Sequence, residues 1–119
     1  MVDEKVLEEL RASVGDDDEF VRDLIEAFLS DSDAQLDAIE AALKANDADA
    51  LVRPAHTLKS SSATVGAMEL SAVARALEMA GRSGSLSDEA THAAGVTVRD
   101  VAETTMAALR AWIAGAGGR

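Results

Sequence analysis

Residues 17–45 read DDEFVRDLIEAFLSDSDAQLDAIEAALKA and carry a long helical pattern. Large apolar side chains recur there at steps of three or four residues, with one step of eight, at Phe20, Leu24, Phe28, Leu36, Ile39 and Leu43. Side chains at this spacing share one face of an α-helix. Val21, Ile25 and Leu29 widen the apolar face in the first half, which predicts that this half contacts two neighbours. Serine and aspartate at residues 30–33 compete for backbone hydrogen bonds, so the helix is weakest there and open to a kink or a break.

The rest of the chain shows four further helical patterns separated by short breaks. They lie at about residues 3–13, from the break at 46–49 to about 65, at about 67–81 and at about 86–114. Pro54 falls early in the third pattern, so that helix either starts late or kinks. Four long amphipathic segments joined by short loops predict an all-α fold, an antiparallel four-helix bundle with the short first helix packed across one end. Residues 1–114 would form this single domain, and residues 115–119 a flexible glycine-rich tail.

The composition excludes several classes of protein. The 119 residues suffice for one domain and carry a net charge of −11, from 22 acids and 11 bases. We expect no nucleic-acid partner, because nucleic-acid binding depends on Lys and Arg that neutralise phosphates. We expect no membrane span, since no apolar run is long enough, and the N-terminus lacks the basic start and apolar stretch of a signal peptide. The lack of cysteine excludes disulfides, thiolate zinc sites and thiol catalysis, and it fits a cytoplasmic location.

The negative charge is confined to the first third of the chain. Residues 1–40 contain 14 acids and three bases, whereas residues 41–119 contain eight of each. The acidic segment is either a solvated helix face, which is the usual meaning of a charge run, or a surface that steers a partner. Between Ala50 and Met68 there is no acidic residue, and the basic residues there are Arg53 and Lys59. This predicts an acid-free surface on which an anionic group would not be repelled.

A helical wheel of the third pattern places His56 away from the core. At about 100° per residue, one side of the wheel collects Leu51, Leu58, Ser62 and Val65. That side must face the core, and His56 falls roughly opposite to it. We therefore predict an exposed imidazole on a rigid helix, and a neutral imidazole is a competent nucleophile.

The neighbours of His56 on the helix surface favour chemistry with an anionic group. Lys59 lies one turn after His56 and Arg53 one turn before it, so either cation could offset negative charge on a group transferred to the ring. Ser60 and Ala63 are small and leave room for a bulky donor. These features alone do not separate a functional histidine from an ordinary surface histidine beside a lysine.

The sequence around His56 closely resembles a known signature. Residues 55–67 read AHTLKSSSATVGA. The motif of histidine-containing phosphotransfer (HPt) domains of bacterial phosphorelays is similar, roughly Ala-His-x-Leu-Lys-Gly-Ser-Ser-x-x-x-Gly-Ala. The resemblance spans about residues 3–112 and includes an acidic turn before Phe20, Phe28-Leu29 before Ser-Asp, Leu70, and Leu77-Glu78.

The resemblance implies roles for individual residues. His56 would be the phosphoacceptor and Lys59 its charge partner. Ser60 stands where the family often has glycine, and its hydroxyl could donate a hydrogen bond to a phosphoryl oxygen. Ser61 and Ser62 would be small packing residues.

The activity that the resemblance implies is that of a phosphorelay intermediate. Such a domain accepts a phosphoryl group from the aspartyl phosphate of a receiver domain, in a hybrid histidine kinase or a response regulator, and passes it to another receiver. Mg²⁺ belongs to the receiver, and we expect no cofactor or metal on this chain. Because no Gly-x-x-x-x-Gly-Lys nucleotide loop is present, we expect a phosphocarrier without ATP-dependent kinase activity of its own. We expect a monomer that docks through apolar surface beside His56, with Leu10, Leu24, Val52 and Ala63 as candidates.

Three other interpretations remain open. The chain could be the histidine-bearing domain of a chemotaxis-type kinase, phosphorylated from ATP on a separate domain, although the serine run and Gly66-Ala67 favour the phosphorelay carrier. Glu89 and His92 have the Glu-x-x-His spacing of a di-iron bundle, but that site needs a second such motif and two further glutamates. The third is a bundle that binds receivers without accepting phosphate, against which the presence of His56 and Lys59 argues.

Overall fold

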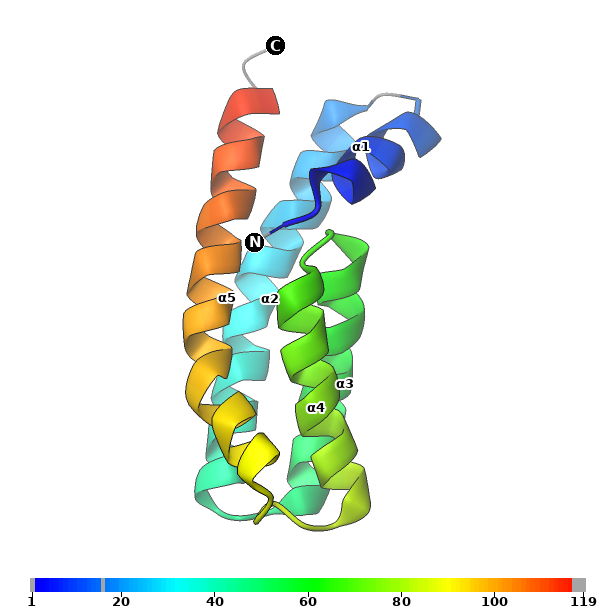
Figure 1. Cartoon of the computed structure of the whole chain (residues 1–119). Coiled ribbons are helices and arrows are strands. Elements are labelled where there is room, and N and C mark those ends of the chain that lie inside the picture. Colours follow the sequence, from blue (N-terminus) through cyan, green and yellow to red (C-terminus); the bar gives the residue numbers. More distant parts are fainter. Residues whose placement is uncertain (1, 16, 117–119) are drawn as a thin grey trace.

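Five α-helices make up the part of the chain that the computed structural model describes, residues 2–15 and 17–116. Their bounds are α1 Glu4–Ser13, α2 Asp18–Lys44, α3 Ala48–Thr64, α4 Met68–Ser83 and α5 Glu89–Ala116. Helices α2 to α5 lie side by side as an antiparallel bundle, and α1 crosses the end at which α3 and α4 join (Figure 1). This arrangement confirms the predicted all-α four-helix bundle with an additional short helix. None of these helices is long and apolar enough to cross a membrane.

The helix starts follow from aspartate caps. The side chains of Asp3, Asp17 and Asp47 each accept a hydrogen bond from a backbone N–H in the first turn of α1, α2 and α3. An aspartate at this position satisfies a donor that has no partner within the helix. At the other end of the chain, α5 continues through Ala116, two residues into the predicted tail. The last residues of that tail, 117–119, lie outside the described part.

Two local expectations are settled by the packing of the helices. Helix α2 passes through residues 30–33 without a break, because Phe28, Ser32 and Leu36 are buried against the other helices. The hydroxyl of Ser32 donates to the carbonyl of Phe28 inside the same helix. Pro54 lies in the interior of α3, which begins at Ala48, so the late start is excluded. Pro54 is buried between neighbouring helices, and its burial offsets the hydrogen bond that proline cannot donate.

A single hydrophobic core joins all five helices. Its largest fully buried side chains are Leu7 of α1, Val21, Ile25, Leu36 and Ile39 of α2, Leu51 and Leu58 of α3, Leu70 and Leu77 of α4, and Val98 and Leu109 of α5. Full burial of a side chain of this size stabilises the folded state by about 2 kcal/mol. The core therefore holds α3 and α4 as rigid supports for anything on their outer faces.

Part of the acidic excess holds α2 against α5. The guanidinium of Arg99 on α5 forms ion pairs with Asp33, Asp37 and Glu40 on α2. All three acids remain exposed, so each pair is screened by water and individually weak. The acids of α2 therefore include both a solvated face and an ionic link between the two longest helices.

Gly66 connects α1 to the turn between α3 and α4. The backbone N–H of Asp3 donates to the carbonyl of Gly66 at 2.7 Å, and Gly66 has a φ of +77°. A Cβ at Gly66 would lie only 2.6 Å from the carbonyl oxygen of Asp3. Glycine is required here both for the left-handed backbone and for the close approach of the N-terminal segment.

We predict that Gly66→Ala destabilises the fold by about 3 kcal/mol, through left-handed strain and the overlap with Asp3. Gly84→Ala is the matched control, because Gly84 has a φ of +81° with nothing within 4 Å of an added Cβ. That variant should lose only about 1 kcal/mol. Urea unfolding followed by circular dichroism measures both losses. Equal losses would contradict a role for the contact with Asp3.

Candidate functional site

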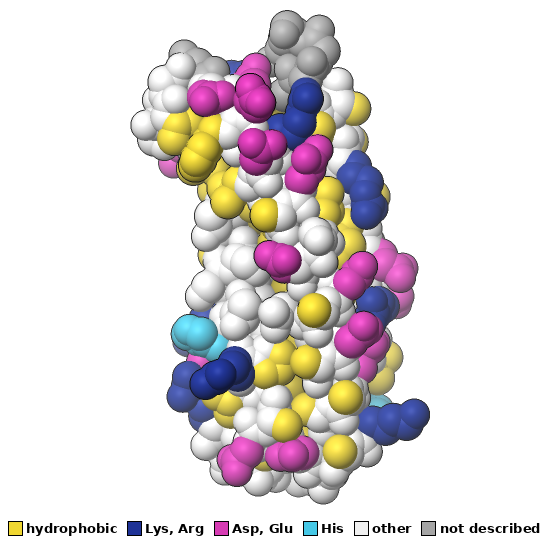
Figure 2. All heavy atoms as spheres, turned by 180° about the vertical axis from the view of Figure 1, so that it is seen from behind, with side chains coloured by type: hydrophobic (Ala, Val, Ile, Leu, Met, Phe, Trp, Pro, Cys, Tyr) yellow, Lys and Arg dark blue, Asp and Glu magenta, His cyan; other side chains and the backbone are white. Residues whose placement is uncertain are grey.

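His56 projects from the outer face of α3. Its side chain is 52% exposed, whereas Leu51, Leu58 and Ser62 on the opposite side of the helix are fully buried. The structure therefore confirms the exposure that the helical wheel predicts. In Figure 2, histidine side chains lie at the edges of the molecule, with Lys and Arg side chains near them.

The imidazole of His56 contacts a buried carboxylate from the neighbouring helix. Glu78 on α4 is only 4% exposed, and its Oε2 lies 3.0 Å from Nδ1 of His56. Its Oε1 lies 2.7 Å from Nζ of Lys59. Arg82, one turn later on α4, places both Nε and Nη2 at 2.8 Å from Oε2. We call Glu78, His56, Lys59 and Arg82 the Glu78 cluster.

The charge state of Glu78 determines which ring nitrogen of His56 is available. The pKa of Glu78 is lowered from its ordinary 4.5 to about 2, above all by the hydrogen bond from Lys59. Burial of the carboxylate raises this pKa, and hydrogen bonds from Arg82 and His56 contribute to the lowering. An ionised carboxylate can only accept hydrogen bonds, so Nδ1 of His56 must carry the hydrogen. In the neutral ring the lone pair is then on Nε2, the nitrogen that does not contact Glu78.

The predicted acid-free surface around His56 is wrong. No acid lies between Ala50 and Met68 in the sequence, but Glu78 reaches His56 from α4. The surface is nevertheless not anionic, because the single carboxylate is paired with two cations, Lys59 and Arg82. With a neutral ring, the cluster carries a net charge of +1.

Close packing of α3 on α4 brings these side chains together. A Cβ on Gly81 of α4 would lie 2.9 Å from Cγ2 of Val52 on α3, so the two helices approach as closely as a glycine permits. The hydroxyl of Ser71 on α4 also donates to the backbone carbonyl of Lys59 at 3.0 Å. These contacts bring the outer face of α4, with Glu78 and Arg82, to the outer face of α3.

The two cations predicted beside His56, Lys59 and Arg53, have different surroundings in the structure. Lys59 belongs to the Glu78 cluster. Arg53 is exposed and, within the described residues, makes no ion pair, while Ser60 is exposed one turn after His56. Sequence reasoning assigned no role to Glu78 or Arg82. Their signal is an acid within the apolar face of the fourth helical pattern, with an arginine four residues later.

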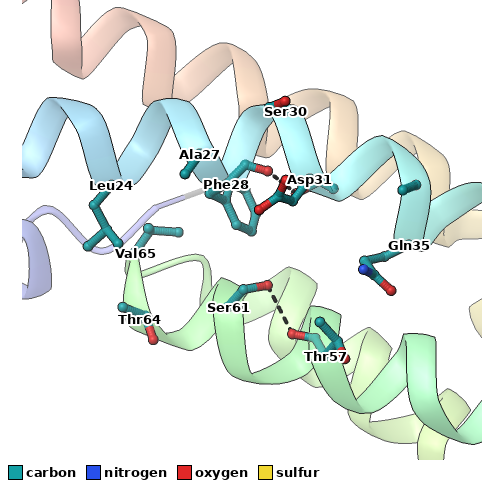
Figure 3. A pocket seen from close by; sticks show the side chains of 12 residues that line it. Leu24, Ala27, Phe28, Ser30, Asp31, Gln35, Thr57, Ser61, Thr64 and Val65 are labelled. Atoms are coloured by element: carbon teal, nitrogen blue, oxygen red, sulfur yellow. Dashed lines mark hydrogen bonds between the residues drawn. The ribbon is translucent and has the colours of Figure 1, made fainter.

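A cavity of about 380 Å³ lies between α2 and α3. Leu24 and Phe28 of α2 and Val65, which follows the last residue of α3, line it with apolar surface, and Thr57 and Ser61 line it on the side of α3 (Figure 3). His56 precedes Thr57 and does not itself line the cavity.

The four docking candidates from the sequence have different surroundings. Leu24 lines the cavity between α2 and α3. Leu10 is half-buried and packs on the core, and Val52 packs against Gly81 of α4. Ala63 is half-buried on α3. Leu24 is therefore the candidate that lines this cavity, and it lies there beside Val65 (Figure 3).

Glu89 and His92 lie at the start of α5, whereas the Glu78 cluster belongs to α3 and α4. His92 is exposed and lines a second cavity, which also includes Leu43 and Gly95. Among the residues that the structure describes, no group of three or more His, Asp or Glu side chains is placed to hold a metal ion. The geometry therefore gives no support to the interpretation as a di-iron bundle.

Comparisons with known proteins agree with the architecture and with the motif. A sequence model of the Hpt domain matches residues 23–112, which is more than half of the chain. The crystal structure of histidine-containing phosphotransfer protein B (HptB) from Pseudomonas aeruginosa PAO1 is similar, with a TM-score of 0.81 and 28% sequence identity over 94% of this chain and 93% of that one. No curated protein sequence matches this chain significantly. From the extent of the sequence match and the shared fold we conclude that the chain belongs to the Hpt domain family.

Proposed function

We propose that this protein is a phosphorelay intermediate that accepts a phosphoryl group on Nε2 of His56 from the aspartyl phosphate of one receiver domain and passes it to another. The observation that carries the proposal is the contact between Nδ1 of His56 and the ionised Glu78. This contact directs the ring lone pair to Nε2, on a side chain that is 52% exposed and accessible to a partner.

The transfer follows from the arrangement of charges in the Glu78 cluster. The Nε2 lone pair attacks phosphorus in line, the N–P bond forms, and the bond from phosphorus to the aspartyl oxygen breaks, leaving its electron pair on the donor carboxylate. Positive charge develops on the ring, and Glu78 stabilises it through Nδ1–H. Lys59 offsets negative charge on the phosphoryl oxygens. Mg²⁺ stays on the receiver domain, and the reverse reaction passes the group to the next receiver.

The cavity between α2 and α3 supports docking of a receiver domain beside His56. Its apolar wall of Leu24, Phe28 and Val65 could accept an apolar side chain of the partner. Thr57, which follows His56 on α3, lines this cavity. A receiver bound there would approach the imidazole from its exposed side.

We predict that His56→Gln abolishes phosphoryl acceptance and leaves helicity unchanged, because the side chain is exposed. The assay incubates the chain with receiver domains phosphorylated on aspartate and follows acid-labile label on this chain. His92→Gln is the matched control, since His92 is the other histidine and is also exposed, and it should accept label normally. Label that persists on His56→Gln would exclude the proposed function. Label that arrives only from the ATP-binding domain of a kinase would favour the chemotaxis-type alternative.

We predict that Lys59→Ala slows phosphoryl transfer about tenfold without abolishing it, which is the effect of losing one charge-assisted hydrogen bond. Stopped-flow or quenched-flow transfer from a phosphorylated receiver measures the rate. Lys44→Ala removes the same charge from the exposed end of α2, outside the Glu78 cluster, and should leave the rate unchanged. Identical kinetics for Lys59→Ala and the unmodified protein would refute an electrostatic role for Lys59.

We predict that Leu24→Ala raises the receiver concentration needed for half-maximal transfer, by about threefold to tenfold, and changes the maximal rate little. The reason is that Leu24 lines the docking cavity without touching the Glu78 cluster. Val96→Ala is the control, because Val96 is an exposed aliphatic residue on α5. If both variants behave alike, the receiver docks elsewhere.

A further inference from the structure

Arg82 and Lys59 bind different oxygens of the same buried carboxylate. Arg82 contacts Oε2 of Glu78 twice, through Nε and Nη2, both at 2.8 Å. Oε2 is also the atom that accepts the hydrogen bond from Nδ1 of His56. Lys59 contacts Oε1 through the single atom Nζ at 2.7 Å. Arg82 therefore acts on the oxygen that orients the imidazole, and Lys59 acts on the other.

The two cations also differ in how firmly they are tied to Glu78. Arg82 lies four residues after Glu78 on α4, so both side chains project from the same face of one helix. Their contact therefore does not depend on the position of α3. Its planar guanidinium directs two N–H groups at one oxygen. Lys59 lies on α3 with His56, one turn away, and has one flexible ammonium that can turn toward a group on the ring.

When a phosphoryl group arrives on Nε2, Glu78 and the phosphoryl oxygens would compete for Lys59. Its oxygens attract Lys59, which can leave Oε1 to offset their charge. Glu78 is buried, and a buried carboxylate without a cationic partner is strongly disfavoured. Two contacts from Arg82 on Oε2 would keep Glu78 paired and in place on Nδ1 while Lys59 is engaged elsewhere.

We propose that Arg82 is a positioning residue for phosphoryl acceptance, which holds the Glu78 carboxylate on Nδ1 of His56 so that Lys59 is free to turn to the incoming phosphoryl group. This assignment rests on the proposed function for its consequence in transfer. Its structural part, the hold on the imidazole through Oε2, can be measured without any phosphoryl donor.

The first measurement is the ring tautomer of His56. The full chain is labelled with ¹⁵N-histidine, and the ring nitrogen shifts of His56 are recorded near neutral pH, with His92 as the internal reference. In the unmodified protein and in Lys59→Ala we expect the form with hydrogen on Nδ1. In Arg82→Ala we expect a mixture with the form that carries hydrogen on Nε2, and in Arg82→Lys an intermediate.

A matched control separates a contact with Glu78 from a change in net charge. Arg75 lies two turns before Arg82 on α4, is exposed, and makes no ion pair within the described residues. Arg75→Ala therefore removes the same charge from the same helix and should leave the tautomer of His56 unchanged. A tautomer in Arg82→Ala identical to that of Arg75→Ala would overturn the proposal, since an ordinary surface ion pair would give that result.

The second measurement is the rate of transfer from a phosphorylated receiver domain. Arg82→Ala should lower the maximal rate about tenfold with little change in the receiver concentration for half-maximal transfer, and Arg82→Lys should recover part of the loss. An unchanged maximal rate in Arg82→Ala would also overturn the role of Arg82 in acceptance. A failure of the proposed function would give a different result, namely label that persists on His56→Gln. In that case the tautomer measurement still tests whether Arg82 orients the His56 ring through Glu78.

Discussion

The buried carboxylate of Glu78 is the interaction on which the functional surface depends. A carboxylate almost removed from water must be paired, and its two oxygens meet that need with Lys59, Arg82 and the Nδ1–H of His56. The same contacts give the imidazole an orientation and a tautomer, and they balance the negative charge beside it. An exposed histidine on a helix is common, but one whose inner nitrogen is occupied by an ionised acid presents its other nitrogen as a nucleophile.

The charged residues of the bundle form two separate groups of ion pairs, one exposed to water and one nearly buried. On α2 and α5, Arg99 binds three exposed acids, which link the two longest helices on a surface open to water. On α3 and α4, one acid meets two bases in a nearly buried position where electrostatic interactions are stronger. Of the acids in the first third of the chain, none belongs to the Glu78 cluster, whereas Asp31 lines the cavity between α2 and α3. The Glu78 cluster, which is net positive with a neutral ring, surrounds the proposed phosphoacceptor His56.

Local properties of the chain were predictable because they depend on residues close together in sequence. The exposure of His56 and the proximity of Lys59 follow from helical periodicity, and both agree with the structure. The sequence left a kink or a break open at residues 30–33, and α2 has no break there because its apolar residues on either side are buried by other helices. The acid-free surface was wrong because Glu78 is 22 residues away from His56 in the sequence.

The amino-acid sequence by itself determined the helices, the apolar faces that form the core, and the exposure of His56, the proposed phosphoacceptor. Each of these depends on spacing along one helix. Only the tertiary structure decided the electrostatics around His56, the nitrogen that carries its lone pair, and the different positions of Lys59 and Arg82. The physical reason is that α4 packs on α3 as closely as Gly81 allows, and the atoms of Glu78 reach the ring only through that contact. Charges that meet across helices are set by packing distance, which spacing along the chain does not contain.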